Sequence, residues 1–457
     1  MKKSLLLASM LVAAFAANAA NDTYNYPEVD GYKLIPISQN SAYNGTWKSL
    51  NQDGAVGAIL PSLDYVRSAT CVGGKVYVPC SKTWNAEGGL DDKGLVLVFD
   101  AMTGEYLEQH QLTVDGAPLE GLLCANVIGQ DDFGHIYVGG YKGVLWVEGT
   151  DAPNPLKIYM LDPTNGACTL AASLEISYDD AQNSGRVDQF DVIGDLTCQE
   201  ARCVVMCAPS GAQGKIICGW HCEQGETEWQ AHLYDGEYIS LLLDDADGYP
   251  AVATFGSGAS VAIVRDEDFS GSMFYVDCFS TCPALYTTEA TLIDSFASNA
   301  EIAPKTAPCG VGEFMFDDQL FLLAGLNEYT SPETNQARLY KLGEGGSFED
   351  ATVLYDFPEA GLGEEKGAGA RLHKLEAVVT EDAAGNKGAY IMSFKCGNGF
   401  AYYLFAEAGF NAGINSAVVE AANAPVEYFN LQGVRVANPE NGIFIRRQGT
   451  TASKVVL

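Results

Sequence analysis

Short apolar runs alternate with polar turns over most of this chain. Two of the clearest runs are "GGKVYVPC" from Gly73 and "FGHIYVGG" from Phe133, about 60 residues apart. Each is followed by two more apolar runs that flank an Asp-x-x-Thr-Gly or Asp-x-x-Asn-Gly turn, at Asp100 and Asp162. An Asp side chain can accept hydrogen bonds from backbone N–H groups two residues on, and Gly supplies a positive φ. The pattern therefore predicts strand, turn and strand in each copy.

The same pattern recurs in weaker form along the rest of the chain. Each unit offers about four short runs rich in Val, Ile, Tyr and Phe, and a helical period is nearly absent between Tyr65 and Gly409. The weaker units contain "FDVIGDLTCQEARCVVMC", "ASVAIVRDEDFSGSMFYVDCF", "GVGEFMFDDQLFLLAG" and "LEAVVTEDAAGNKGAYIMSF". With the two clear copies, the chain holds six such units.

Six repeats of four short antiparallel strands predict an all-β fold, a β-propeller with six blades over residues 65–409. One such sheet cannot bury both of its faces, whereas blades arranged radially cover each other. We expect residues 20–64 to supply strands that close the ring by pairing with the last blade. Seven blades would result if "GYKLIPISQN" and "TWKSLNQDGAVGAIL" formed a further unit. A pair of β-sandwiches is the alternative, which the even recurrence disfavours.

One stretch of the second unit carries a family resemblance. "GQDDFGHIYVGG" (Gly129–Gly140) resembles the strand, Asp/Gly turn and "IYV" core of NHL-type and related propellers. The resemblance implies the propeller fold. Members of that broad class include enzymes, binding scaffolds and adhesive surface proteins, so the fold does not decide the function.

The first residues have the pattern of a cleaved signal peptide. Lys2 and Lys3 precede an apolar run from Leu5 to Ala17 and an Ala-Asn-Ala motif, which predicts a signal peptide over residues 1–19. A transmembrane anchor is the alternative, but the run is shorter than the roughly 20 residues that span a bilayer. The first cysteine is Cys71, so a lipid-modified N-terminal cysteine is not supported. We expect an exported protein without a transmembrane segment, located in the periplasm, on the outer cell surface or outside the cell.

The last residues differ in charge from the rest of the chain. An Ala/Asn/Gly-rich linker (residues 410–425) precedes a tail (residues 426–457) in which basic residues outnumber acidic ones. The tail resembles the short C-terminal tail of exported Bacteroidales proteins, a relative of the type IX secretion sorting domain. The matching parts are "YFNLQGVRV" (Tyr428–Val436), "NPENGIFIRR" (Asn438–Arg447) and "KVVL" (Lys454–Leu457). The resemblance implies export across the outer membrane, although a full sorting domain is longer. The alternative is a last strand of the propeller.

The overall charge argues against nucleic acid and anionic membranes as partners. The chain has 59 acidic and 26 basic residues, for a net charge of −33. Such a protein lacks the cations that bind nucleic acid, and anionic membrane surfaces repel it. We interpret the negative net charge as a feature that keeps the protein soluble in an extracellular setting. We expect a monomer.

Five of the 13 cysteines cluster around His221, as the ligands of a metal site do, but their spacing argues against such a site. They are Cys198, Cys203, Cys207, Cys218 and Cys222. Zinc sites favour C-x2-C pairs, whereas the closest spacings here are C-x3-C within strand-like runs. Positions four apart in a strand lie roughly 13 Å from each other. Cys207 and Cys218 flank a turn and could face each other. Buried thiols or one cross-strand disulfide are therefore favoured over a metal site.

No catalytic motif stands out in the sequence. The histidines, His110, His135, His221, His232 and His373, sit in or beside strand patterns without metal-ligand spacing. "SAYNGTW" (Ser41–Trp47) is a near miss of a sialidase Asp box, and we interpret it as a turn. "DDADG" places Asp244, Asp245 and Asp247 at a spacing that calcium loops use. It lacks the downstream Glu, so an ordinary turn is favoured over calcium, and no other cofactor is expected.

The loops between the second and third strands of several units are long. In a propeller these loops emerge on one face, which would bring Trp84, Tyr141, Trp146 and Tyr329 to a common rim. Aromatic side chains in polar loops stack on sugar rings or anchor protein partners. The alternative is that each ring packs on its own blade. Trp84 is the best candidate, because no apolar periodicity surrounds it.

Two functions remain open. The first is a non-catalytic propeller that binds glycan or protein through this rim. The second is a glycan hydrolase or lyase with a site at the central channel, which predicts two or three titratable groups converging near the axis with perturbed pKa values. The missing motifs and scarce histidines favour the first.

Overall fold

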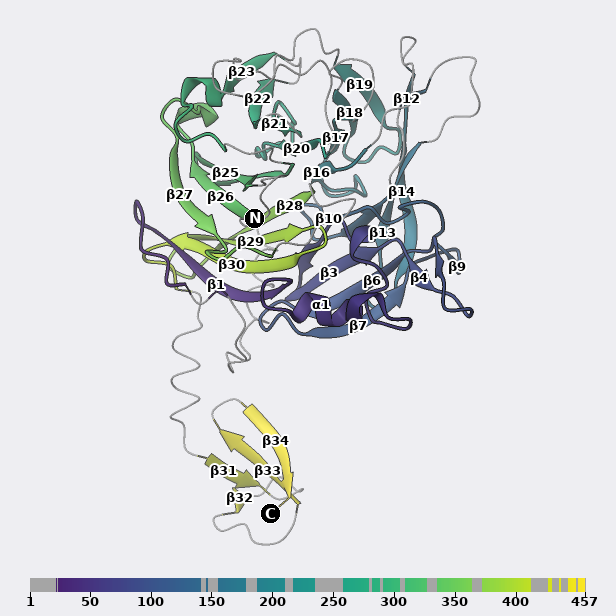
Figure 1. Ribbon diagram of the computed structural model, residues 1–457. Helices are drawn as coiled ribbons and strands as arrows, with labels where there is room; N and C mark the ends of the chain where they lie inside the picture. Colours follow the sequence, from purple (N-terminus) through teal and green to yellow (C-terminus); the bar gives the residue numbers. More distant parts are fainter. Residues whose placement is uncertain are drawn as a thin grey trace.

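The computed structural model describes most of the chain. The described residues are 22, 24–140, 145–146, 155–177, 187–209, 217–234, 258–278, 282–287, 291–304, 309–326, 335–363, 372–411, 426–429, 435–436, 443–448 and 451–456. They form a six-bladed β-propeller and a small separate sheet at the C-terminal end (Figure 1). The all-β prediction with six blades is confirmed.

Each blade is a sheet whose four main strands follow one another antiparallel from the axis outward. The first three blades are β2 (Thr70–Val72), β3 (Lys75–Cys80), β6 (Leu95–Asp100) and β7 (Tyr106–Gln111); β10 (Val127–Gln130), β11 (Ile136–Gly139), β13 (Leu156–Leu161) and β14 (Ala167–Leu174); and β16 (Phe190–Gly194), β17 (Cys203–Cys207), β18 (Ile217–Cys222) and β19 (Gln230–Tyr234). The other three are β20 (Ser260–Ile263), β21 (Met273–Asp277), β22 (Ala284–Thr287) and β23 (Leu292–Ser295); β24 (Val311–Phe316), β25 (Gln319–Leu326), β26 (Gln336–Lys341) and β27 (Thr352–Phe357); and β28 (His373–Glu381), β29 (Lys387–Lys395), β30 (Gly399–Glu407) and β1 (Tyr32–Ser41).

Short elements decorate this ring. Blade 2 is extended by the small hairpin β8 (Thr113–Val114) and β9 (Ala117–Pro118). Two further two-stranded ribbons are β4 (Thr83–Trp84) with β5 (Leu90–Asp91), and β12 (Leu145–Trp146) with β15 (Ile176–Ser177). The helical elements are α1 (Thr46–Asn51) and the 3-10 turns Gln52–Gly54, Leu63–Tyr65, Phe296–Ser298 and Glu344–Gly346.

The first strand of the chain completes the last blade. β1 pairs antiparallel with β30, from Tyr32 opposite Glu407 to Ser41 opposite Gly399. Gly399 has a φ of +90°, and a Cβ there would lie 2.2 Å from the Asn40 carbonyl oxygen, so the pairing needs glycine at this position. The stretch "TWKSLN" forms α1 and not a strand. Among the described residues there is consequently no seventh blade.

The apolar core lies between the blades. The buried side chains divide into clusters, and each cluster draws on two neighbouring sheets. The interface of blades 1 and 6 also receives Trp47 of α1, which stacks on Phe99 and meets Phe394 edge-on. Neighbouring sheets thus bury the faces that one sheet alone would leave exposed.

The Asp-containing turns form as the sequence predicts. The Asp100 carboxylate accepts hydrogen bonds from the backbone N–H groups of Met102 and Thr103, both at 2.9 Å. The Asp162 carboxylate accepts one from the Thr164 backbone at 2.9 Å. Both turns connect the third and fourth strands of a blade.

The cysteine cluster of blade 3 lies within paired strands. Cys203 faces Cys222, and Cys207 faces Cys218, across the β17–β18 pair. These cysteines and Cys198 are buried free thiols, and burial raises the pKa of the Cys218 thiol well above its usual value. They do not form a group of three metal-ligand atoms in the described part of the chain. The structure therefore has the buried thiols that the spacing favours.

The C-terminal sheet has its own strand order. β31 (Val426–Phe429) pairs with both β32 (Arg435–Val436) and β33 (Ile443–Gln448), and β34 (Thr451–Val456) pairs with β33. No hydrogen-bonded strand pair links this sheet to the propeller among the described residues. The described helices are all too short or too polar to cross a bilayer.

The position of Trp47 generates a stability prediction. Trp47→Ala should lower the free energy of unfolding by about 3–5 kcal/mol, because it leaves a cavity where three aromatic rings meet between blades 1 and 6. Urea unfolding followed by circular dichroism measures the change. The matched control is Tyr43→Ala nearby, whose side chain is 60% exposed and should change stability by less than about 0.5 kcal/mol. Equal effects of the two substitutions would contradict the assignment of Trp47 as a core residue between blades 1 and 6.

Candidate functional site

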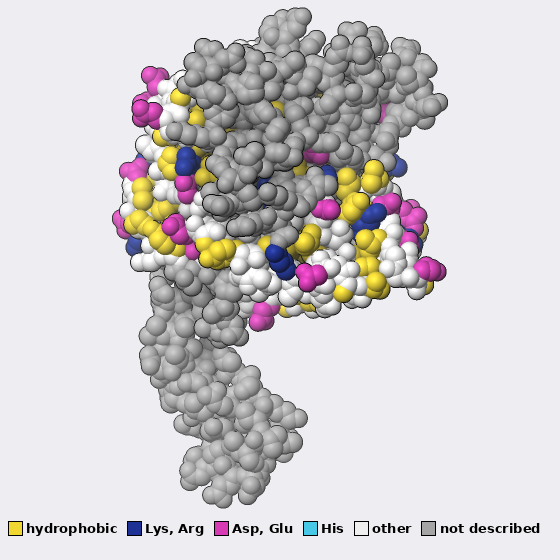
Figure 2. All heavy atoms as spheres, in the orientation of Figure 1, with side chains coloured by type: hydrophobic (Ala, Val, Ile, Leu, Met, Phe, Trp, Pro, Cys, Tyr) yellow, Lys and Arg dark blue, Asp and Glu magenta, His cyan; other side chains and the backbone are white. Residues whose placement is uncertain are grey.

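The propeller has two chemically different ends. Because the strands of a blade are antiparallel, the loop from β3 to β6 emerges at the end opposite the β2–β3 turn. We call the end with the second-to-third-strand loops the loop face and the other end the turn face. Figure 2 shows one view of the described surface, with acidic side chains spread over it and fewer basic ones between them.

The structure describes only part of the predicted rim. Trp84 lies in the ribbon β4–β5 on the loop face, and Trp146 lies in β12, of which the backbone alone is described. Tyr141 and Tyr329 lie outside the described residues, as do Asp244, Asp245 and Asp247 of the calcium-like turn. The common aromatic rim and the calcium loop therefore stay predictions.

Trp84 is half-buried and fixed in place by one hydrogen bond. Its indole Nε1–H donates to the Ala58 carbonyl oxygen at 2.9 Å. The ribbon that carries it is closed by Asn85, whose side-chain oxygen accepts from the Gly89 backbone N–H at 2.8 Å. The segment around Ala58 thus braces the ribbon, and part of the indole stays accessible to solvent.

Apolar and charged residues lie in and beside the ribbon of Trp84: Leu90 pairs with Trp84, and Asp91 pairs with Thr83. Val56 and Leu90 are exposed, and Val56 lies beside Gly88 of the ribbon loop. Asp91 accepts hydrogen bonds from Lys93 at 2.9 Å and from Asn85 at 3.1 Å. We call Val56, Trp84, Leu90, Asp91 and Lys93 the Trp84 platform. It combines an anchored tryptophan with an ion pair, Asp91 and Lys93, from the same loop.

Near the loop face, one side chain links several blades across the axis of the ring. Gln189, just before β16 of blade 3, donates from Nε2 to the carbonyl oxygens of Cys309 (3.1 Å) and His373 (3.2 Å) in blades 5 and 6. Ser260 of blade 4 donates to the Gln189 side-chain oxygen at 3.2 Å. A Cβ at Gly310 would lie 2.0 Å from the His373 carbonyl oxygen, so β24 and β28 approach too closely for a side chain there.

Buried ionisable groups lie near the hydrogen bonds of Gln189. The Asp277 carboxyl accepts from the Gly310 backbone N–H at 3.2 Å, and burial raises its pKa to about 8. Burial lowers the pKa of Lys395 to about 7 and that of His373 well below its usual value. All three side chains are buried, so in this structure they act as interior groups of the ring.

A second polar cluster lies at the turn-face end of the channel, where Arg265 joins three blades. Its guanidinium donates to Asp132 of blade 2 at 3.0 Å and to Glu313 of blade 5 at 2.9 Å. Asp191 of blade 3 lies 3.6 Å from the same guanidinium. We call these four residues the Arg265 cluster. Sequence reasoning missed it, because Arg265 and its partners lie far apart in the chain.

Carboxylates outnumber cations around the Arg265 cluster. Glu376 of blade 6 adds a further one, which accepts from the Thr70 hydroxyl at 2.7 Å. Burial raises the pKa of Glu313 to about 7, and it also raises the pKa values of Asp132 and Glu376. Titratable groups with perturbed pKa values thus converge near the axis, as the hydrolase alternative predicts. The Glu313 side chain is 0% exposed beneath Arg265, however, and does not face a substrate.

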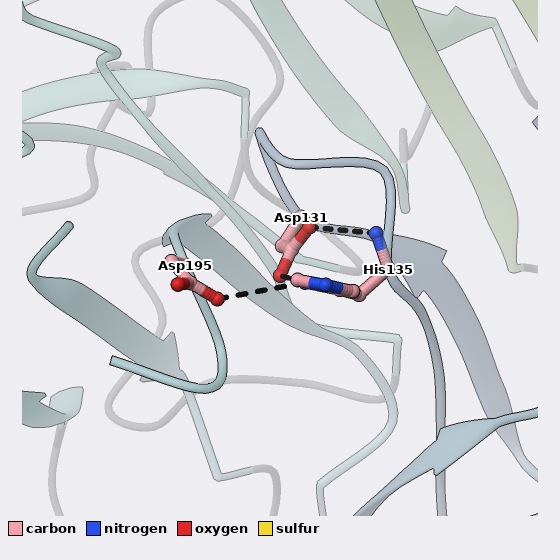
Figure 3. A group of neighbouring side chains, drawn as sticks. All are labelled: Asp131, His135 and Asp195. Atoms are coloured by element: carbon pink, nitrogen blue, oxygen red, sulfur yellow. Dashed lines mark hydrogen bonds and ion pairs between the residues drawn. The ribbon is translucent and has the colours of Figure 1, made fainter. Parts of the chain in front are cut away.

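His135 belongs to a third cluster on the turn face (Figure 3). Its Nδ1 lies 2.8 Å from the Asp131 carboxylate and 3.5 Å from that of Asp195. The three residues are the one group in the described part of the chain whose ligand atoms lie close enough to hold a metal ion. Backbone N–H groups already occupy the carboxylates: Leu196 donates to Asp131, and Glu200 donates to Asp195. The arrangement therefore orients the imidazole and ties blade 2 to blade 3.

Comparisons with known proteins show the fold. No protein-family model and no curated protein matches the sequence. The chain is similar to a DUF4623 family protein from Bacteroides eggerthii, with 13% identity, 84% of this chain and 77% of that chain covered, and a TM-score of 0.50. It is also similar to the α-L-arabinofuranosidase Arb93A from Fusarium graminearum (9% identity, 76% and 95% covered, TM-score 0.39) and to an α-L-arabinanase from Penicillium chrysogenum (8%, 77% and 97%, 0.40). At these identities the likeness concerns the fold alone.

The Arg265 cluster generates a pH-dependence prediction. The pKa of Glu313 rises from 4.5 in the unfolded chain to about 7 in the folded protein, so folding favours the protonated form. Its contribution to stability is then present below pH 4.5 and is lost as the pH rises toward 7 and above, by roughly 3 kcal/mol at most. In Glu313→Gln this part of the pH dependence should vanish.

Urea unfolding of both proteins at pH 5 and pH 8 measures this effect. The wild-type protein should lose more stability than the variant between the two values, and the exposed substitution Glu87→Gln should behave as wild type. Identical pH dependences of wild type and Glu313→Gln would show that Glu313 is ionised in both folded and unfolded states.

Proposed function

We propose that this protein is an exported, non-catalytic propeller that binds neutral glycan through the Trp84 platform on its loop face. The observation that carries the proposal is the state of Trp84. The indole N–H is satisfied by Ala58, and the residue is nevertheless partly exposed on its ribbon. A tryptophan held in this way is pre-organised for a ligand.

The surroundings of Trp84 favour a sugar over other ligands. The apolar face of a sugar ring packs on an indole, and its hydroxyls need donors and acceptors at the edge. Asp91 accepts and Lys93 donates next to the platform, and the two form an ion pair at 2.9 Å. Lys93 also lies 3.7 Å from Glu120, so carboxylates already offset its charge and it does not attract an anionic ligand, which favours a neutral glycan.

Export is the second part of the proposal. It is supported by the basic start, short apolar run and Ala-Asn-Ala motif of residues 1–19, and by the resemblance of the tail to a short sorting tail. The high negative charge keeps such a protein soluble. We propose that it acts at the cell surface or beyond as a monomer.

One observation favours a second candidate function, glycan hydrolysis at the channel. Asp132, Glu313 and Glu376 converge near the axis with raised pKa values, as a general acid requires. Burial of Glu313 and the engagement of Asp132 by Arg265 weigh against it. We therefore place it second.

A glycan array tests the first proposal. Wild-type protein should bind at least one neutral glycan, and Trp84→Ala should weaken that binding by tenfold or more, which corresponds to about 1.4 kcal/mol. The matched control is Trp229→Ala, which alters another half-buried tryptophan next to β19 in blade 3, on the turn face. Equal binding by wild type and Trp84→Ala would refute the platform, and binding of proteins without any glycan would favour a protein partner.

The same glycans separate binding from hydrolysis. Each bound glycan is incubated with wild type and with Glu376→Gln, and the products are analysed by mass spectrometry. The binding proposal expects intact glycan from both proteins. Products released by wild type and not by Glu376→Gln would replace it with the hydrolase.

A further inference from the structure

A hollow lies between blades 1 and 2 on the turn face, at the end opposite the Trp84 platform. Its volume is about 530 Å³, within the range of small-molecule sites. It is formed by the β2–β3 turn (Val72, Gly73), the β10–β11 turn (Gly134, His135) and the β13–β14 turn (Pro163, Thr164). Three turns from two blades thus enclose it.

Tyr77 lines this hollow with an unused polar group. The side chain comes from β3 and is only 4% exposed. Its hydroxyl makes no hydrogen bond with any of the residues that the structure describes, and its oxygen is not among the fully buried side-chain atoms that lack a partner, so it can be reached from the hollow. Burial raises the pKa of Tyr77, so the hydroxyl keeps its proton and can donate. A ligand in the hollow would satisfy this group.

His135 supplies a second, oriented group. Its Nδ1 bonds the Asp131 carboxylate, which is 0% exposed, and the imidazole itself is 35% exposed and lines the hollow. With Nδ1 engaged by a carboxylate, Nε2 is left to contact a ligand. The Asp131 carboxylate of blade 2 thereby fixes the imidazole (Figure 3), which lines the hollow together with residues of blade 1.

The remaining walls indicate the chemistry of the ligand. Ile136, Met160, Leu161 and Pro163 are apolar. Lys75 and Glu108 also line the hollow and lie 3.5 Å apart, so their charges offset each other. A ligand here needs an apolar surface, several hydroxyls and no net charge. Small sugars have this combination.

We propose that this hollow is a second binding site, for the monosaccharide unit of a neutral glycan, with Tyr77 and His135 as its hydrogen-bonding residues. The site goes beyond the function proposed for the loop face and does not depend on it. The two sites lie at opposite ends of blade 1, so one glycan unit cannot occupy both.

Titration calorimetry of the full-length protein tests this proposal. The probes are D-glucose, D-galactose, L-arabinose and N-acetyl-D-glucosamine, with D-galacturonate as the charged comparison. At least one neutral sugar should bind saturably. Tyr77→Phe, which removes the hydroxyl alone, and His135→Gln should each weaken binding by tenfold or more.

Two control variants make the result specific. Trp84→Ala removes the loop-face site, so a neutral sugar that still binds this variant saturably occupies another site. Tyr286→Phe removes a hydroxyl that is buried without a hydrogen bond in blade 4 and should bind as wild type does. Absence of saturable binding, or loss of binding in Trp84→Ala with retention in Tyr77→Phe, would overturn the second site. Tighter binding of D-galacturonate than of every neutral sugar would overturn the assignment to a neutral ligand.

Discussion

A four-stranded antiparallel sheet with apolar side chains on both faces cannot exist alone in water, and the whole molecule follows from this constraint. Every described apolar cluster is shared by two neighbouring blades. A line of such sheets would still expose its two end faces, so the array must close into a ring. The closing interface, between blades 1 and 6, is also where α1 inserts Trp47.

Features that depend on neighbours in the sequence were predictable, and those that depend on closure of the ring were not. The strand runs and the Asp100 and Asp162 turns are local, since an Asp side chain meets backbone N–H groups two residues away. Arg265, in contrast, joins Asp132 and Glu313 only because the first strands of separate blades converge on the axis. The helix α1 was missed for a different reason. Its six residues are too few to show a helical period.

The side chain of Gln189 links blades across the axis near the loop face, and the two ends of the ring carry different groups. It spans blades 3, 5 and 6 by hydrogen bonds to two backbone carbonyls, and the buried Asp277 and Lys395 lie near the same end of the ring. The loop face presents an anchored tryptophan, whereas the turn face presents oriented acids and His135. A propeller of this kind can therefore hold different ligands at its two ends.

The pairing of β1 with β30 also sets the order of events when the chain is made. A ribosome or a transport channel delivers the protein from its N-terminus, so β1 emerges first and its partner emerges after every other strand of the ring. Until then the last blade lacks its outer strand and the interface of blades 1 and 6 lacks one of its walls. Contacts that span the whole sequence form late and slowly. A polypeptide truncated before Gly399 therefore has no partner for its first strand and cannot close the ring.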